Sequence, residues 1–497
     1  MRTSNGNRSV LIPSFIGVIL LLISASYSNV LHSPPVLDDL HSFVFQPVIR
    51  QHGLSIHTLL GLSETIFGWS RWIPMATFSF DYWMGSGDIA NFHLTNIVIH
   101  CFAMLAVFFL SSQVLEASRC IGNESIIASP HLQAAFIAGL WALHPVQTNA
   151  VTYLVQRMTS LQALFYILSV ALYVLGRRRQ IEHGGVRGAA PFYALCVLSA
   201  ICAFVSKQNS ATLPCMLFLT ELWFFQPDLI KRIWQPLRRR GWLTRTFLTL
   251  VCIAGSVCAY KVIHSVLEGY GIRDFTLSER LLTESRIVIW YISFLLWPAP
   301  SRMSLEHDVV VSTSLWSPPT TLLSILTLGS LLYLIVRYRK QYPVATYAGM
   351  WFFLNLVIES TFVPLELLFE HRLYLPSFGI AMLIVTSLTA ATRYLGHSAN
   401  ASARDLQILM MCCFALLMSG LTLTTFTRNE TWSDAVSIYR DALAKSPGKA
   451  RSHANVATAL YRVGAYADAI QEAEAAIKIG APHKEQYIVA ANTIVMA

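Results

Sequence analysis

The sequence has few charged residues. Asp, Glu, Lys and Arg make up 13% of its 497 residues, and 54% are hydrophobic, with a mean hydropathy of +0.51. A soluble globular domain carries about 25% charged residues. So much apolar surface needs lipid as its solvent, which excludes an ordinary soluble domain. The composition therefore predicts a polytopic membrane protein.

Several site signatures are also absent. The nine cysteines are scattered, and their spacing indicates neither a disulfide framework nor a zinc site, so no metal ligands are predicted. Neither GxxxxGK[ST] nor G-x-G-x-x-G occurs, which excludes those two nucleotide-binding loops. The net charge of +9 reports orientation in a membrane protein, so nucleic acid is not predicted as a partner.

Long apolar runs are what the sequence has instead. A helix crosses the hydrocarbon core with ~20 residues, and eleven segments qualify: 10–29, 93–112, 133–151, 158–176, 190–206, 210–225, 246–264, 319–336, 343–362, 374–392 and 406–425. The first lacks a clear cleavage site and is interpreted as a retained signal anchor. Segment 281–297 contains Glu284 and Arg286, which favour an interfacial or re-entrant helix, with a twelfth span as the alternative. The predicted fold is a mostly α-helical membrane bundle of about 11 to 12 spans.

The basic residues predict its orientation. With the N-terminus inside, alternate loops carry 18 of the 36 Lys and Arg residues, including Arg177–Arg179 and Arg238–Arg240. This satisfies the positive-inside rule. Two long loops of the membrane domain 1–426, at 30–92 and 265–318, are then outside, together with the tail 427–497.

The tail has a different composition. Residues 449–482 form one 34-residue unit with Gly464, Tyr466, Ala469 and Ala476 at turn and packing positions, which matches a tetratricopeptide repeat, and 483–497 could add one more helix. About three repeats are needed for independent stability, so the tail is expected to rest on the membrane domain or its outer loops.

An acidic pair, Asp38 and Asp39, follows the first span in an aromatic-rich loop. Carboxylates there could act as a general base or hold a divalent cation. The alternative is a solvated turn that caps a helix. Further along, His93, Asn96 and His100 share one helix face, where they either belong to a site or make interhelix hydrogen bonds.

Three other outer turns present polar groups. Arg157, Lys207 and Arg372 lie outside, against the positive-inside trend, and either snorkel to the interface or bind an anionic ligand. The candidates in these turns are His144, Arg157, Lys207, Glu370, His371 and Arg372. A carboxylate could take a proton from an acceptor hydroxyl while cations stabilise a departing phosphate whose apolar tail stays in the bilayer. That chemistry is glycosyl transfer from a polyprenyl-phosphate donor.

The order of the motifs resembles a known family. The chain reads RWIPMATF, FHLTNIVIH, LHPVQTNAVTYLVQR, SKQ, EHRLYLPSFG and TRNETWSDAVSIYRDAL after the Asp pair. This is similar to the transmembrane-and-tetratricopeptide (TMTC-type) proteins and their bacterial relatives. The resemblance implies a GT-C fold, similar to protein O-mannosyltransferases, with a polyprenyl- or dolichyl-phosphate sugar donor and hydroxyl groups of protein as acceptors.

Residue roles follow from this resemblance. Asp38 and Asp39 match the acidic motif of the first outer loop, in which one carboxylate is the catalytic base. Arg372 matches the [E/H]R-x-YLP motif, and with Arg157 and Lys207 it is expected to contact the lipid phosphate. Gln208 stands where relatives usually have the Glu of Ser-Lys-Glu, which predicts altered activity or a different donor.

Alternatives to this hypothesis remain at the level of sequence. The same fold could act on a lipid or a cell-envelope polymer, or the chain could be a non-catalytic scaffold whose repeats recruit a partner. Tetratricopeptide repeats usually grip peptides, which favours a protein acceptor. The expected location is a bacterial inner membrane with a periplasmic site, or an endoplasmic reticulum membrane with a luminal one.

Overall fold

A computed structural model describes residues 5–50, 55–65, 67–120, 129–229, 260, 263–398, 402–480 and 494–496. Within these ranges the chain forms helices, turns and loops and no β-strand. The cluster Arg238–Arg240 lies outside the described residues, and so does almost all of the predicted span 246–264 and of the last predicted helix, 483–497.

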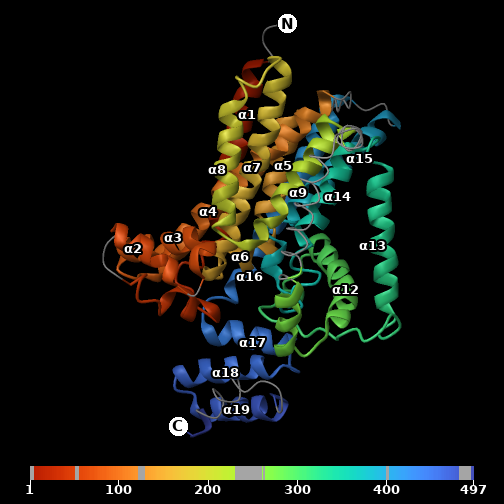
Figure 1. The fold of residues 1–497 in the computed structure, drawn as a ribbon. Coiled ribbons are helices and arrows are strands. Elements are labelled where there is room, and N and C mark those ends of the chain that lie inside the picture. Colours follow the sequence, from red (N-terminus) through yellow and green to blue (C-terminus); the bar gives the residue numbers. More distant parts are fainter. Residues whose placement is uncertain are drawn as a thin grey trace, which may run out of the picture.

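The centre of the molecule is a bundle of long helices (Figure 1). α4 packs against both α5 and α7, α7 packs against α8, and α14 packs against α15. The main helices of the bundle are α1 (Asn5–Ser26), α4 (Ile89–Cys120), α5 (Pro130–Ala142), α7 (Arg157–Glu182), α8 (Ala190–Phe204), α9 (Leu213–Thr220), α13 (Thr320–Arg337), α14 (Pro343–Leu356), α15 (Ser377–Ser398) and α16 (Ala403–Glu430).

Five of the described helices are long and apolar enough to cross a membrane. They cover Ile89–Arg119, Leu154–Glu182, Thr320–Arg337, Ser377–Gly396 and Arg404–Glu430. Ile12–Ser26 and Ala190–Phe204 are shorter apolar helices. Together with the low charge content, these helices identify a multi-pass membrane protein.

Two predicted spans have different limits in the structure. α5 ends at Ala142, well before the predicted limit at residue 151, because Pro145 disfavours helical backbone in the residue before it. The short helix α6 (Thr148–Val151) follows. α9 covers only Leu213–Thr220 of the span 210–225 and continues as a wide π-helical turn, Glu221–Phe225.

The elements predicted to lie outside gather at one end of the bundle, opposite the start of α1 (Figure 1). We call this the tail end, and the opposite one the N-terminal end. The tail end carries α2 (Ile56–Gly61), α3 (Trp72–Gly85), α12 (Leu277–Leu296), α17 (Ala435–Lys445), α18 (Ala450–Arg462) and α19 (Tyr466–Gly480). α12 covers the ambiguous segment 281–297 and begins with a capping box between Thr276 and Glu279.

The tail rests on the rest of the chain. α18 and α19 form a helical hairpin whose interface is rich in alanine, and Gly464 has a positive φ of 83° in its turn. Lys445 donates from Nζ to the carbonyls of Pro300 and Met303, and Ser452 donates to Glu306 Oε2 at 2.8 Å. The tail is thus attached to the loop that follows α12.

Candidate functional site

A turn at Leu37 and Asp38 lies between α1 and α2 at the tail end. Leu37 has a φ of +44°, a left-handed backbone conformation that residues with a Cβ rarely adopt. Its amide donates to Tyr439 Oη at 3.0 Å, and the amide of Asp38 donates to Tyr153 Oη at 3.0 Å. Two tyrosine hydroxyls, one from the bundle and one from α17, therefore hold this turn.

The two adjacent carboxylates have different environments. Asp39 is 1% exposed and accepts from the amides of Val36 (2.9 Å) and Val155 (2.7 Å). Burial raises the pKa of Asp39 to about 8. Asp38 is exposed, and within the described residues no hydrogen bond reaches its carboxylate. Asp39 thus fastens the turn, while Asp38 is accessible to a substrate.

Four cations from four separate segments form what we call the cationic cluster: Arg71, Lys207, Arg280 and Arg372. Lys207 Nζ lies 3.5 Å from Glu359 Oε1 and donates to Thr159 Oγ1 at 2.8 Å. Burial lowers the pKa of Lys207. The positive charges of Arg71 and Arg372 lower it further, and the negative charge of Glu359 opposes this shift. Arg280 also contacts Glu359, Arg372 contacts the same loop, and Gln208 contacts Ser70 beside Arg71, so the four segments meet at one place.

Backbone carbonyls of the loop after α14 hold two members of the cluster. Arg372 donates from Nη1 to the carbonyl of Leu367 (3.0 Å) and from Nη2 to that of Glu366 (2.7 Å). Arg280 donates to the carbonyls of Glu359 (2.7 Å) and Thr361 (2.8 Å). Carbonyls orient a guanidinium without neutralising it, so both positive charges persist.

The cluster has more positive than negative charge. Its buried carboxylates are Glu359, paired with Lys207, and Glu284, which lies 2.8 Å from Arg280 Nη2. Buried charges are costly unless they are paired, and four cations beside the buried Glu359 and Glu284 and the exposed Asp38 leave a positive excess that favours an anionic ligand. Such a ligand would be held most strongly where water is excluded.

Arg71 connects the cluster with the acidic turn. Burial lowers the pKa of Arg71 and the nearby charge of Asp38 opposes this shift, while Arg71 in turn lowers the pKa of Lys207. Its buried Nε has no hydrogen-bond partner within the described residues. Arg71 is the first residue of the RWIPMATF motif and was not among the predicted site residues. Its position outside, against the positive-inside trend, is the signal that could have identified it.

Arg157 is engaged elsewhere. It is fully buried, with Nη1 2.5 Å from Asp81 Oδ2 and Nε donating to Asn96 Oδ1 at 2.6 Å. Its guanidinium also lies 4.1 Å from the centre of the Phe78 ring. Arg157 therefore forms a buried structural ion pair with Asp81, and this geometry does not support a role for it as a phosphate ligand.

The candidate imidazoles and Asn96 tie segments together. His144 Nδ1 accepts from the amide of Val146 at 3.2 Å, so Nε2 carries the proton and donates to the carbonyl of Leu295 at 3.2 Å. His93 Nε2 pairs with the carbonyl of Ser33 at 2.9 Å, and Asn96 donates to the carbonyl of Val151 at 2.9 Å. The bonds of His93 and Asn96 agree with the alternative that their shared face of α4 makes hydrogen bonds to other segments.

The two residues before Arg372 are placed differently. Glu370 accepts from the amide of Ser304 at 2.6 Å and lies 2.9 Å from His307 Nε2, so it fastens the loop after α12. His371 stacks on Phe369 beside the cationic cluster. Burial and the charges of Lys207, Arg372 and Arg71 lower the pKa of His371 well below its ordinary value, which makes it a neutral neighbour of these cations.

Gln208 contacts Ser70, the residue before Arg71. Its Nε2 donates to Ser70 Oγ at 2.9 Å, and the side chain is exposed. A neutral amide therefore lies beside the segment of Arg71, where the resemblance predicts a carboxylate. Within the described residues, no group of three or more His, Cys, Asp or Glu side chains could hold a metal ion.

Curated proteins similar to this chain are named protein O-mannosyl-transferases. The Caenorhabditis elegans protein O-mannosyl-transferase F38B6.6 is 23% identical over 94% of this chain, and human protein O-mannosyl-transferase TMTC1 is 22% identical over 94% of it. Human TMTC3, which has the same kind of name, is 22% identical over 78% of the chain. The chain spans only 63%, 55% and 42% of these relatives. No family model matches the chain, and no solved structure is significantly similar to it.

Proposed function

We propose that this relative of the TMTC-type protein O-mannosyl-transferases is a membrane glycosyltransferase that moves a sugar from a polyprenyl-phosphate donor to a hydroxyl group of an extracytoplasmic protein. One observation carries the proposal. The exposed carboxylate of Asp38 lies near enough to Arg71 to raise its pKa against the effect of burial, and the hydrogen bond from Gln208 to Ser70 joins the segment of the half-buried Arg71 to that of the buried Lys207. A base and an anion site are therefore adjacent.

In this proposal Asp38 takes the proton of a serine or threonine hydroxyl. The hydroxyl oxygen attacks the anomeric carbon of the sugar, and the bond from that carbon to the phosphate oxygen breaks. The negative charge that develops on the leaving phosphate is stabilised by Lys207, Arg372 and Arg71. The polyprenyl chain remains in lipid, so the donor is a membrane substrate with its sugar at the tail end. The GT-C fold is part of this proposal.

The tail is proposed to be a tetratricopeptide unit that helps to hold the protein acceptor. Its first helix, α17, contacts the acidic turn directly through Tyr439. Concave surfaces of such repeats commonly bind extended peptides. A peptide bound to the tail would then reach Asp38 without crossing the molecule.

The experiment is a transfer assay with the full chain in lipid nanodiscs, a polyprenyl-phosphate-mannose donor and a serine- and threonine-rich peptide. Asp38→Asn should lower the transfer rate by roughly 10²–10⁴-fold, the contribution of a general base. The matched control is Asp88→Asn, since Asp88 is also exposed at the tail end and only caps the turn before α4 through the amide of Ala90. Wild-type transfer by Asp38→Asn would contradict the proposal.

A further inference from the structure

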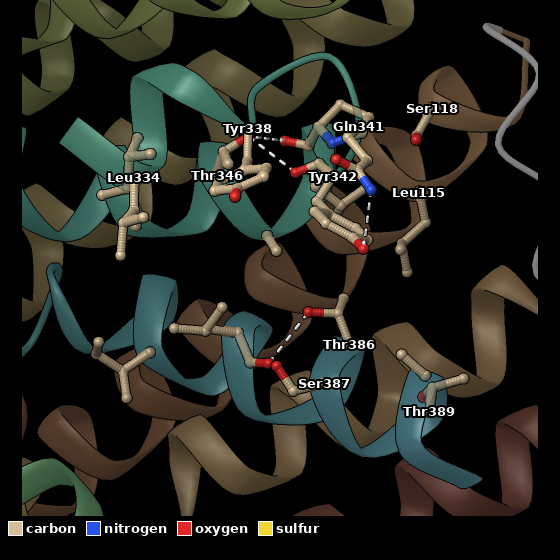
Figure 2. A pocket seen from close by; sticks show the side chains of 18 of the residues that line it. Leu115, Ser118, Leu334, Tyr338, Gln341, Tyr342, Thr346, Thr386, Ser387 and Thr389 are labelled. Atoms are coloured by element: carbon tan, nitrogen blue, oxygen red, sulfur yellow. Dashed lines mark hydrogen bonds between the residues drawn. The ribbon is translucent and has the colours of Figure 1, made fainter. Parts of the chain in front are cut away.

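An apolar groove runs along α13, α14 and α15 and has a volume of about 1220 Å³. Figure 2 shows Tyr338, Gln341 and Tyr342 on one side of the space and Thr386 and Ser387 of α15 on the other. None of the residues of the cationic cluster lines it. The groove is therefore separate from the cationic cluster.

Its length corresponds to one leaflet of a bilayer. The lining residues of α15 run from Ile380 to Tyr394, which at 1.5 Å per residue is about 21 Å of helix. Half of a typical hydrocarbon core is about 15 Å thick. A single acyl chain with its headgroup at the rim thus fits the length of the groove.

The groove lies open along the edge of the bundle. Only 11% of the α13 helix is buried, and Figure 1 shows α13 standing at the side of the other helices. α13 approaches α14 closely at Gly349, where an added Cβ would lie 2.7 Å from Ile335 Cδ1. The glycine permits this contact, and lipid can reach the adjoining space from the bilayer.

The rim is positively charged and lies at the N-terminal end. Arg119 comes from the last turn of α4 and Arg393 from the last part of α15, with Tyr338 and Tyr342 beside the α13–α14 turn. No Asp or Glu is among the described lining residues. Tyrosine and arginine at this level of a membrane protein are suited to headgroups, and the arginines to anionic ones.

We propose that this groove binds an anionic phospholipid from the leaflet at the N-terminal end, with an acyl chain between α13 and α15 and its phosphate near Arg119 and Arg393. The donor lipid does not suit this place. Arg372 lies just before the start of α15, whereas Arg393 lies 16 residues after its first residue, about 24 Å away along the helix. The two anion sites therefore face opposite leaflets, and this inference does not depend on the proposed function.

The test is native mass spectrometry of the purified full chain with equal amounts of phosphatidylglycerol and phosphatidylcholine. The wild type should retain phosphatidylglycerol at least five-fold more than phosphatidylcholine, and the double variant Arg119→Gln/Arg393→Gln should lose that preference. Arg337→Gln/Arg339→Gln is the control, because these arginines lie at the same end of α13 and α14 and do not line the groove. Ser387→Trp, which fills the exposed lining of α15, should reduce retention of both lipids.

Equal retention of the two lipids by the wild type would overturn the proposal, and so would an unchanged preference in the Arg119→Gln/Arg393→Gln variant. Undecaprenyl phosphate supplies the last arm. If it displaces phosphatidylglycerol from the wild type and Ser387→Trp prevents that binding, the groove holds the donor chain, and the proposal of a separate phospholipid is wrong.

Discussion

Asp38 and Asp39 are neighbours in the sequence, but backbone geometry gives them different environments. The acidic pair and its place after the first span were predicted from the sequence. Which carboxylate is buried could not be predicted, because it depends on the amide of Val155, 116 positions away from Asp39. The same limit applies to Arg157, whose partner Asp81 lies in a separate segment.

Asp39 should make stability depend on pH. Its folded-state pKa of about 8 lies above the ordinary value of 3.8, so the folded chain holds a proton that the unfolded chain has lost between about pH 4 and pH 8. The stability contributed by this group is complete below that window and is lost as the pH rises through 8. Asp38, Arg157, Tyr153 and Tyr439 face the same carboxyl group.

Asp39→Asn cannot titrate, so its thermal unfolding temperature in detergent should fall less between pH 5 and pH 8.5 than that of the wild type. Asp88→Asn should keep the wild-type pH dependence, since Asp88 is exposed. Parallel curves for Asp39→Asn and the wild type would show that Asp39 is ionised across the range.

Arg372 is the member of the cationic cluster with the clearest geometric requirement. Its two terminal nitrogens donate to two carbonyls, an arrangement that the single nitrogen of lysine cannot reproduce. Arg372→Lys should raise the KM for a polyprenyl-phosphate donor about ten-fold or more, and Arg372→Ala should raise it further. Arg337→Ala, at the N-terminal end, should leave the KM unchanged. A wild-type KM in Arg372→Lys would leave donor binding to Lys207 and Arg71.

Among the elements, helices were easier to predict than their ends. The long apolar runs predicted α4, α7, α13, α15 and α16, and the repeat pattern predicted the α18–α19 hairpin. The early end of α5 has a local signal in Pro145 that the length of the apolar run concealed. The loop that wraps Arg280 and Arg372 with carbonyls has no periodic pattern, so its role could not be read from the sequence.

The turn at Leu37 makes a prediction about Tyr439. A left-handed residue other than glycine costs of order 1–3 kcal/mol and persists only when its surroundings hold it. Tyr439→Phe removes the hydroxyl that accepts from Leu37, so Asp38 should lose its orientation. We expect at least a ten-fold lower kcat with little change in the donor KM, because the cationic cluster is intact.

Two variants separate positioning from general damage. Leu37→Gly in the Tyr439→Phe background should partly restore kcat, because glycine adopts a positive φ without strain. Tyr461→Phe, in the tail hairpin, should behave as wild type, since the tyrosine is 40% exposed and lies against Tyr466. An unchanged kcat in Tyr439→Phe would mean that Tyr153 alone sets the turn.

At the scale of the whole molecule, the two ends of the bundle match the two sides of the membrane that the basic residues predict. Arg177–Arg179 lie in the last part of α7, at the N-terminal end of the bundle, and the acidic turn and the helical tail lie at the other end (Figure 1). The positive-inside rule therefore assigns the two ends to opposite sides of the membrane.

This orientation can be measured by cysteine labelling in a background without native cysteines. Ser433→Cys, exposed just before α17, should react with an impermeant maleimide from the non-cytoplasmic side of sealed membranes. Gly188→Cys, exposed between α7 and α8, should react only after permeabilisation. The reverse pattern would show that the topology is inverted and that the proposed site lies on the cytoplasmic side, away from its acceptor.

The bond between Leu37 and Tyr439 also has a consequence for biosynthesis. It joins residues that are 402 positions apart, so almost all of the helices are translated before the partner of Leu37 is made. A nascent chain that lacks α17 has the acidic pair but only one of the two tyrosine hydroxyls that hold the turn. The order of synthesis thus leaves the turn at Asp38 incompletely held until α17 has folded onto the bundle.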